Sequence, residues 1–277
     1  MAQEFNITDY FQRIGYAGEQ TANLDTLRAV QYHHATSIPF ENLNPFLGIP
    51  VRLDIQSIAQ KLIYEKRGGY CFEHNLLLKH VLEVIGFKVT GLAARVRWNA
   101  PDDVITSRGH MLLLVEVDKE RYIVDVGFGL MTPTAPLRLV TGVEQSTQLE
   151  KYRLIGEKHD FILEANIRNE WKALYRFDLQ EQFLPDYEVT NWYLSNHPES
   201  HFVTELIVDQ PGRDRRNALH NNRFSVRYLD GRNEKTVLKS VDEIRDILQN
   251  VFLLKLPDTS ELDEKLEKLI IEEAAGT

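Results

Sequence analysis

A single cysteine occurs in the chain of 277 residues, and it lies in an unusual segment, RGGYCFEHN. Cys71 follows two glycines and opens CFEHNLLLKHVLEVIG, whose apolar residues recur at helical spacing. The unpaired N–H groups and the dipole at a helix N-terminus favour an anion, and therefore a thiolate over a thiol. We interpret Cys71 as a nucleophile. The alternative is a small buried hydrophobic residue, which is the usual role of a free cysteine.

A thiolate nucleophile needs a basic or cationic partner, and that partner needs a group to orient it. Among the nine histidines, His110 differs because it opens the apolar segment HMLLLVEV, where an imidazole has little reason to pack. Asp125 is the matching carboxylate, inside YIVDVGFG at the end of the next expected strand, and a buried charge there requires a hydrogen-bond partner. The order Cys71, His110, Asp125 is that of papain-like and transglutaminase-like triads.

The hairpin that joins these two strands sets the distance between His110 and Asp125. A turn at Lys119 and Glu120 would place both side chains on one face, with Asp125 opposite Leu114. At about 3.3 Å per residue, Asp125 would then lie roughly 13 Å along the ladder from His110. Direct contact would require a β-bulge, strong coiling, or a histidine that turns back from the start of its strand.

The elements that must position these residues follow from periodicity. Residues 9–87 are predicted to be helical, with N-caps at Asp25 and Asp54 and an irregular, largely apolar loop at 38–50. Later helices are predicted at 186–196 and 260–275. Strands are predicted at KVTGLAARVRW, GHMLLLVEV, RYIVDV, KYRLIGE, DFILEAN, WKALYRF and HFVTELIVD, and in a hairpin that turns at Asp230–Gly231.

These patterns predict an α+β fold of three parts. A helical region over residues 1–87 carries the nucleophile, a central antiparallel sheet or barrel over 88–200 carries the histidine and the aspartate, and a smaller α/β region spans 201–277. An arginine cluster in the last part is expected to be a surface hairpin, with an anion site as the alternative. Its members are Arg213, Arg215, Arg216, Arg223 and Arg227.

Composition excludes several classes of protein. The formal net charge of −9 argues against a nucleic-acid partner, because such proteins need a basic surface that displaces counterions from phosphates. No run approaches the roughly 18 apolar residues of a membrane span, and MAQEFNITDY lacks the apolar core of a signal peptide. One cysteine cannot form an internal disulfide, which agrees with a reducing compartment. We therefore expect a cytoplasmic protein with neither nucleic-acid nor membrane partners.

The segment RGGYCFEHN resembles the signature of the arylamine N-acetyltransferases. SIPFENL, ARVRW, HMLLLV and DVGFG are similar to further blocks of that family in the same order, so the resemblance spans nearly the whole chain. It implies that Cys71, His110 and Asp125 form a catalytic triad on a cysteine-protease-like core made of a helical bundle, a β-barrel and an α/β lid. It also implies transfer of acetyl from acetyl-CoA to arylamines, arylhydrazines and N-hydroxyarylamines, by a ping-pong mechanism through an acetyl-cysteine.

The same resemblance implies roles for residues around the nucleophile. Those expected to line the acceptor pocket are Phe40, Val96, Phe128 and Phe202. Those expected near bound CoA are Gly127, Phe128 and Gly129. Arg67 and Glu41 would form a buried pair that supports the active-site loop. Acetyl-CoA would be a co-substrate, with no metal and no tightly bound cofactor, and the protein would be a monomer or a homodimer.

Two other classes stay open at this point. A cysteine hydrolase, such as a peptidase or transglutaminase, uses the same triad order and would release its acyl group to water without any need for CoA. A binding module with a degenerate triad would hold a Cys71 no more reactive than a free thiol.

Overall fold

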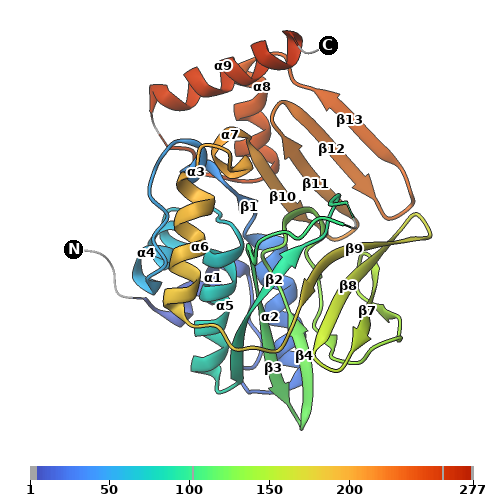
Figure 1. Cartoon of the computed structure of the whole chain (residues 1–277). Helices are drawn as coiled ribbons and strands as arrows, with labels where there is room; N and C mark the ends of the chain where they lie inside the picture. The colour runs from blue at the N-terminus through green and yellow to red at the C-terminus, as the bar shows by residue number, and fades with distance from the viewer. Residues whose placement is uncertain (1–4, 102, 258, 276–277) are drawn as a thin grey trace.

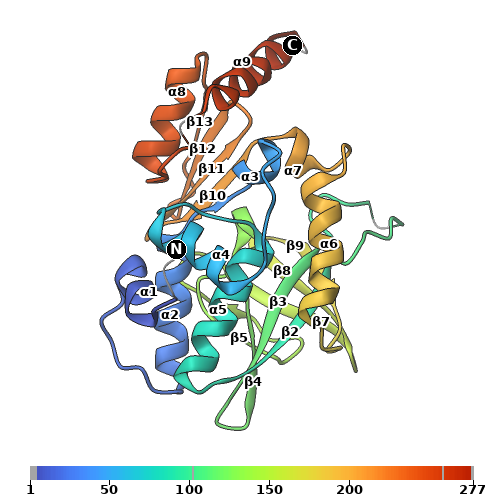
Figure 2. The same cartoon turned by 90° about the vertical axis from the view of Figure 1, so that its left-hand side faces the viewer.

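The computed structural model describes residues 5–101, 103–257 and 259–275. Its N-terminal part is helical, as predicted (Figures 1 and 2). The helices are α1 (Ile7–Ile14), α2 (Leu24–Ser37), α3 (Leu43–Phe46), α4 (Ile55–Ala59) and α5 (Cys71–Ile85), and a π-helical turn, Gln60–Tyr64, continues α4. Among the described helices, none is both long and apolar enough to cross a membrane.

The helix caps agree with the sequence at one of the two predicted positions. Asp54 caps α4, because its side chain accepts a hydrogen bond of 2.9 Å from the N–H of Ser57. The cap predicted at Asp25 is wrong, since Asn23 accepts the 2.8 Å bond from the N–H of Thr26 and Asp25 lies in the first turn of α2. A carboxylate in that turn still interacts favourably with the helix dipole.

The segment 38–50 is more ordered than the predicted loop. It contains the short strand β1 (Phe40–Glu41) and the single helical turn α3. The side chain of Asn42 links both to the C-terminal part, because it donates to the carbonyl oxygen of Glu205 at 2.6 Å and accepts from the N–H of Ile207 at 2.7 Å. These long-range hydrogen bonds hold a proline-rich segment in regular structure.

The central part is an antiparallel sheet of eight strands, in the order β5-β4-β3-β2-β9-β8-β7-β6, coiled into a nearly closed barrel (Figure 1). The strands are β2 (Lys88–Val96), β3 (His110–Val117), β4 (Glu120–Val124), β5 (Leu137–Arg138), β6 (Gln145–Ser146), β7 (Lys151–Glu157), β8 (Asp160–Ile167) and β9 (Glu170–Phe177). A 3₁₀ turn, Gly129–Met131, and the helix α6 (Leu184–Asn196) flank them. The predicted antiparallel barrel is confirmed.

The β3–β4 hairpin turns one residue earlier than predicted. Asp118 and Lys119 form the turn with φ values of 50° and 68°, and Leu113 pairs with Val124. The next residue, Asp125, therefore lies opposite Leu112 and about 7 Å along the ladder from the start of β3, instead of the predicted 13 Å. Diagonal neighbours at that spacing contact each other directly, so this hairpin needs no bulge.

The C-terminal part is a five-stranded sheet, in the order β1-β10-β11-β12-β13, covered by helices. Its elements are α7 (His201–Thr204), β10 (Ile207–Pro211), β11 (Arg215–His220), β12 (Arg223–Tyr228), β13 (Asn233–Val237), α8 (Val241–Asp246), a π-helical turn, Ile247–Val251, and α9 (Ser260–Ala275). The strand predicted over HFVTELIVD is wrong in its first half, because Asn42 donates to the carbonyl oxygens of Phe202 and Glu205 and holds 201–204 as a helical turn. The domain boundaries at 87/88 and 200/201 stay a prediction.

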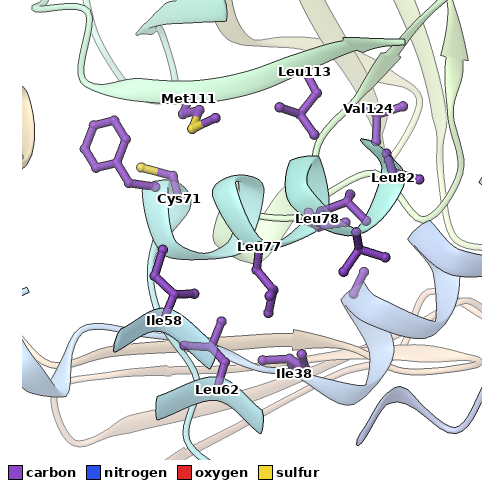
Figure 3. Packing of buried hydrophobic residues seen from close by; sticks show 14 of the residues in the cluster. Ile38, Ile58, Leu62, Cys71, Leu77, Leu78, Leu82, Met111, Leu113 and Val124 are labelled. Atoms are coloured by element: carbon purple, nitrogen blue, oxygen red, sulfur yellow. The ribbon is translucent and has the colours of Figure 1, made fainter. Parts of the chain in front are cut away.

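Helix α5 lies at the centre of the largest apolar core (Figure 3). Leu77, Leu78, Val81 and Leu82 have no exposed surface, and burying each side chain contributes about 2 kcal/mol to folding. On one side the helix packs against the β3–β4 hairpin, and on the other it faces α4 and the π-helical turn. Gly86, at a φ of 106°, ends the helix as predicted. The core thus holds the start of α5 against the start of β3.

Buried charges join the barrel to the C-terminal sheet. Arg216 of β11 is 2% exposed, and its Nη2 atom lies 2.6 Å from Oε2 of Glu150 in the barrel. Arg216 also donates to the carbonyl oxygen of Thr132 at 2.9 Å and to the hydroxyl of Tyr152 at 3.1 Å. The predicted surface position is therefore wrong for Arg216, because its guanidinium group has partners inside the barrel.

We predict that Arg216→Met lowers the free energy of unfolding by about 3 kcal/mol, because it leaves the largely buried Glu150 carboxylate with only the longer, 3.4 Å ion pair to Arg227. The neighbouring variant Arg215→Met removes the same charge from an exposed pair with Asp214, and should cost less than about 1 kcal/mol. Urea unfolding followed by tryptophan fluorescence measures both. Equal losses for the two variants would contradict a buried ionic link between barrel and sheet.

Candidate active site

Cys71 is the first residue of α5 and is 3% exposed. The two preceding glycines bring the chain close to β1: the N–H of Glu41 donates to the carbonyl oxygen of Gly69 at 2.8 Å. A Cβ atom at Gly68 would collide with the carbonyl oxygen of Pro39. Glycine is therefore required at position 68, because only it lets the segment before Cys71 pass so near β1.

His110 and Asp125 are in direct contact. The Nε2 atom of His110 lies 2.7 Å from Oδ2 of Asp125, and the two side chains are 3% and 0% exposed. The Cys71 thiol donates to the carbonyl oxygen of Gly109, the residue before His110, at 3.7 Å, and Cys71 and His110 line the same cavity. The structure therefore brings together all three residues that were singled out for nucleophilic chemistry. Cys71 is the first residue of α5, His110 is the first residue of β3, and Asp125 directly follows β4.

Asn75 is a further member of this cluster that the sequence reading missed. Its Nδ2 atom donates to Oδ1 of Asp125 at 3.1 Å and to the carbonyl oxygen of Met111 at 2.8 Å, and its Oδ1 atom accepts from the N–H of Val126 at 3.2 Å. The spacing could have identified it, because Asn75 lies four residues after Cys71 and hence on the same face of α5. Asn75 orients the carboxylate that orients the imidazole.

The charges of the cluster are set by burial and by one another. Burial lowers the pKa of His110, but the charge of Asp125, its hydrogen bond and the contact with Cys71 outweigh burial and raise this pKa to about 10. For Asp125, burial raises the pKa, while the charge and hydrogen bond of His110, the N–H of Gly127 and the amide of Asn75 lower it below its ordinary value. At neutral pH the pair is therefore an imidazolium and a carboxylate.

The segment after Asp125 passes directly over the nucleophile. A Cβ atom at Gly127 would lie 2.7 Å from the Cα atom of Cys71. The N–H of Gly127 also donates to Oδ1 of Asp125 at 2.9 Å. The ring of Phe128 packs edge-on against the imidazole of His110, with 5.1 Å between centroids. This segment therefore fits tightly over the site and orients an aromatic ring next to the imidazole.

A cavity of about 770 Å³ opens onto Cys71 and His110. Every residue that was expected to contact acceptor or CoA lines it. These residues are Phe40 (β1), Val96 (β2), Gly127, Phe128, Gly129 and Phe202 (α7). Phe202 packs against the rings of Phe40 and Tyr70 at centroid distances of 6.1 and 5.4 Å. The resulting wall is apolar and aromatic and suits a flat aromatic molecule.

The buried pair of Arg67 and Glu41 lies behind the segment that precedes Cys71. The Nη2 atom of Arg67 is 2.8 Å from Oε1 of Glu41. Lys61 lies 2.8 Å from Glu73 of α5, so the carboxylate in the first turn of this helix is also paired. Within the described part of the chain, no three histidine, cysteine, aspartate or glutamate side chains are grouped to hold a metal ion.

A second hollow, of about 850 Å³, lies at the outside of the barrel and does not reach Cys71. Its arginines are occupied: Arg97 donates to the carbonyl oxygens of Val104 and Pro101, and Arg176 pairs with Asp160 at 2.6 Å. Cys71, His110 and the residues expected to contact acceptor or CoA do not line this hollow, whereas they do line the cavity at Cys71.

Fold and geometry together define an enzyme with a cysteine-protease-like core and a cysteine–histidine–aspartate cluster. Residues 23–261 match a family model described as N-acetyltransferase. The arylamine N-acetyltransferase of Mycolicibacterium smegmatis is 42% identical, with 92% of this chain and 94% of that protein covered. The arylamine N-acetyltransferase / N-hydroxyarylamine O-acetyltransferase of Salmonella typhimurium is 36% identical, with 90% and 89% covered.

Solved structures agree with these sequence matches. The Mycobacterium marinum arylamine N-acetyltransferase in complex with CoA superimposes with a TM-score of 0.92 at 39% identity, covering 95% of this chain and 99% of that one. The chain belongs to the arylamine N-acetyltransferase family, whose members are acyltransferases.

We predict that the imidazole of His110 titrates near pH 10, and that Asp125→Asn shifts the midpoint down by several units, because burial then acts without the opposing carboxylate charge. Nitrogen-15 NMR of the histidine rings measures the midpoint. A matched control is Asp160→Asn, which removes the same charge from an exposed pair with Arg176 and should leave His110 unchanged. A wild-type midpoint near 6.5 would contradict the ion pair.

The same pKa has a consequence for stability. A histidine whose pKa is raised in the folded state stabilises that state fully below its unfolded pKa of about 6.5 and loses this contribution as the pH rises through the folded pKa. The stability advantage of wild type over Asp125→Asn should therefore decrease between about pH 6.5 and pH 10. Urea unfolding at several pH values measures it.

Proposed function

We propose that the protein transfers an acetyl group from acetyl-CoA to the nitrogen of arylamines and arylhydrazines, or to the oxygen of N-hydroxyarylamines, through an acetyl-Cys71 intermediate. The observation that carries this proposal is that Cys71 shares one aromatic cavity with an imidazolium, His110, that is bound to a buried carboxylate, Asp125. The names of the relatives, and the CoA complex of one of them, support the choice of donor and acceptor.

In the first half-reaction the Cys71 thiolate attacks the carbonyl carbon of acetyl-CoA. The carbon–sulfur bond to CoA breaks, the leaving thiolate takes the proton of the His110 imidazolium, and the acetyl group stays on Cys71 as a thioester. Exchange of one thioester for another changes the free energy little. Asp125 keeps the imidazole in the orientation and tautomer that proton transfer requires.

In the second half-reaction an amine nitrogen attacks the acetyl-Cys71 carbonyl. The nitrogen loses a proton to the neutral imidazole of His110, and the bond between the acetyl carbon and sulfur breaks. The amide product departs, and the thiolate–imidazolium pair is restored. Arylamines are mostly unprotonated at neutral pH and can attack, whereas alkylamines are mostly cationic and cannot. Phe40, Phe128 and Phe202 give the cavity an apolar wall that suits an aromatic ring and limits water.

The two substrates occupy the cavity in turn. We assign the acceptor ring to the wall formed by Phe40, Val96, Phe128 and Phe202. We assign the thioester end of CoA to the segment Gly127–Gly129, which packs against the nucleophile at Gly127.

We predict that wild-type protein incubated with acetyl-CoA and no acceptor gains one acetyl group, detected by intact-mass spectrometry. Cys71→Ala should gain none, because Cys71 is the sole thiol of the chain. Cys71→Ser keeps a hydroxyl of similar size and serves as the matched control, since a weak nucleophile at the same place should acetylate far more slowly. An unmodified wild-type protein would contradict the mechanism.

Initial rates distinguish a transferase from a hydrolase. Rates measured against acetyl-CoA at several fixed concentrations of an arylamine should give parallel double-reciprocal lines, because CoA leaves before the amine binds. CoA release without acceptor should be slow, and an arylamine should accelerate it many-fold. Intersecting lines would indicate a ternary complex, and equally fast release with and without amine would make the protein a thioester hydrolase.

A further inference from the structure

A buried carboxyl group lies in the wall of the cavity without a role in the chemistry described above. Asp209 of β10 is 7% exposed and lies directly opposite Phe40 of β1 and Ala218 of β11. Ser225 of β12 follows as the next residue across the sheet. All four residues line the cavity that contains Cys71, so one face of the C-terminal sheet forms a wall of this cavity with a carboxyl group in it.

Cys71 and Asp209 lie at opposite ends of the short segment 127–129. A Cβ atom at Gly129 would lie 3.0 Å from Oδ2 of Asp209, and a Cβ atom at Gly127 would lie 2.7 Å from the Cα atom of Cys71. Two residue steps span at most about 7 Å. That span is close to the length of a benzene ring with substituents in para positions, so an arylamine whose nitrogen reaches Cys71 can present its far end to Asp209.

The carboxyl group of Asp209 has spare hydrogen-bonding capacity. The N–H of Leu130 faces it, but in residues 5–101, 103–257 and 259–275 no side chain donates a hydrogen bond to it. Burial raises the pKa of Asp209 to about 7, although the charges of Arg216, His220 and Arg227 lower it. A desolvated carboxylate with unused acceptor sites binds donors or cations and repels anions.

We propose that Asp209 is a specificity-determining residue: its carboxylate binds an N–H donor at the far end of an aromatic acceptor and rejects acceptors that carry a carboxylate there. This inference rests on the proposed function, because it concerns the acceptor of the same cavity. It separates two groups of arylamine that an apolar pocket alone would treat alike, since both present the same ring and the same nucleophilic nitrogen.

The test compares 4-aminobenzamide with 4-aminobenzoate, two acceptors of the same shape that differ in charge and in the amide N–H. At pH 8, wild type should prefer the amide, and Asp209→Asn should reduce the ratio of the two kcat/KM values by about tenfold or more. Asn keeps the shape of Asp and still accepts from Leu130, so the turn should survive. Asp209→Ser, which is smaller and uncharged, should change the ratio in the same direction.

The matched control is Glu205→Gln, which removes the same charge from a carboxylate that lines the cavity and pairs with His220 at the surface. It should leave the ratio unchanged. An effect of Glu205→Gln as large as that of Asp209→Asn would overturn the inference, because the preference would then come from total charge. A second result would also overturn the inference: Asp209→Asn acetylates Cys71 more slowly with acetyl-CoA while the ratio of the two kcat/KM values stays unchanged. Asp209 would then act on the acetyl donor.

A second measurement separates this inference from the proposed function. Protection of Cys71 from iodoacetamide by 4-aminobenzamide and by 4-aminobenzoate reports their binding without any acetyl-CoA. The affinity ratio should shift in Asp209→Asn as the kinetic ratio does. A shift in protection without acetyl transfer would support the role of Asp209 and contradict the acetyltransferase, whereas unchanged ratios in both measurements overturn the assignment of Asp209.

Discussion

The site depends on the satisfaction of one buried carboxylate. Asp125 has no exposed surface, and an isolated charge there would be too costly to bury. Its two oxygens receive hydrogen bonds from the imidazole of His110, the amide of Asn75 and the N–H of Gly127. These donors come from a strand, a helix and a loop, so the three elements that build the site must assemble before the charged Asp125 can be buried without a large cost in free energy. The stability of the fold and the arrangement of the candidate site therefore share one interaction.

Helix α5 connects the chemistry to the core. Its first residue is Cys71, and four residues later Asn75 binds the carboxylate that orients the imidazole. Leu77, Leu78, Val81 and Leu82, which follow, are fully buried between the β3–β4 hairpin on one side and α4 with its π-helical turn on the other. Because packing fixes the axis of α5, the distances between the nucleophile and its orienting partners are set by buried contacts and not by residues at the exposed surface. The active-site geometry is thus a property of the core.

The two carboxyl groups near the cavity have opposite environments. Burial raises the pKa of both, but for Asp125 the charge and hydrogen bond of His110 outweigh it, whereas for Asp209 burial dominates. Asp125 is bound by donors on all sides and lies behind the cavity, while Asp209 faces into it. A fully satisfied group orients its neighbours, and an incompletely satisfied group is available to a ligand.

The sequence by itself determined the elements and the identity of the reactive residues. Hydrophobic periodicity and capping located α5, β3, β4 and α9, because an apolar stripe is stable only where it packs against the core. Cys71, His110 and Asp125 were recognised because each departs from the pattern of its neighbours. The tertiary structure decided everything that depends on distant partners. The turn at Asp118 and Lys119 shifted the hairpin by one residue, and backbone conformations of this kind leave little trace in side-chain patterns.

Asn75, Arg216 and Asp209 are ordinary polar residues in the sequence, and their partners lie 36 residues or more away. A buried polar group is recognised by what surrounds it, and only the folded chain brings those surroundings together.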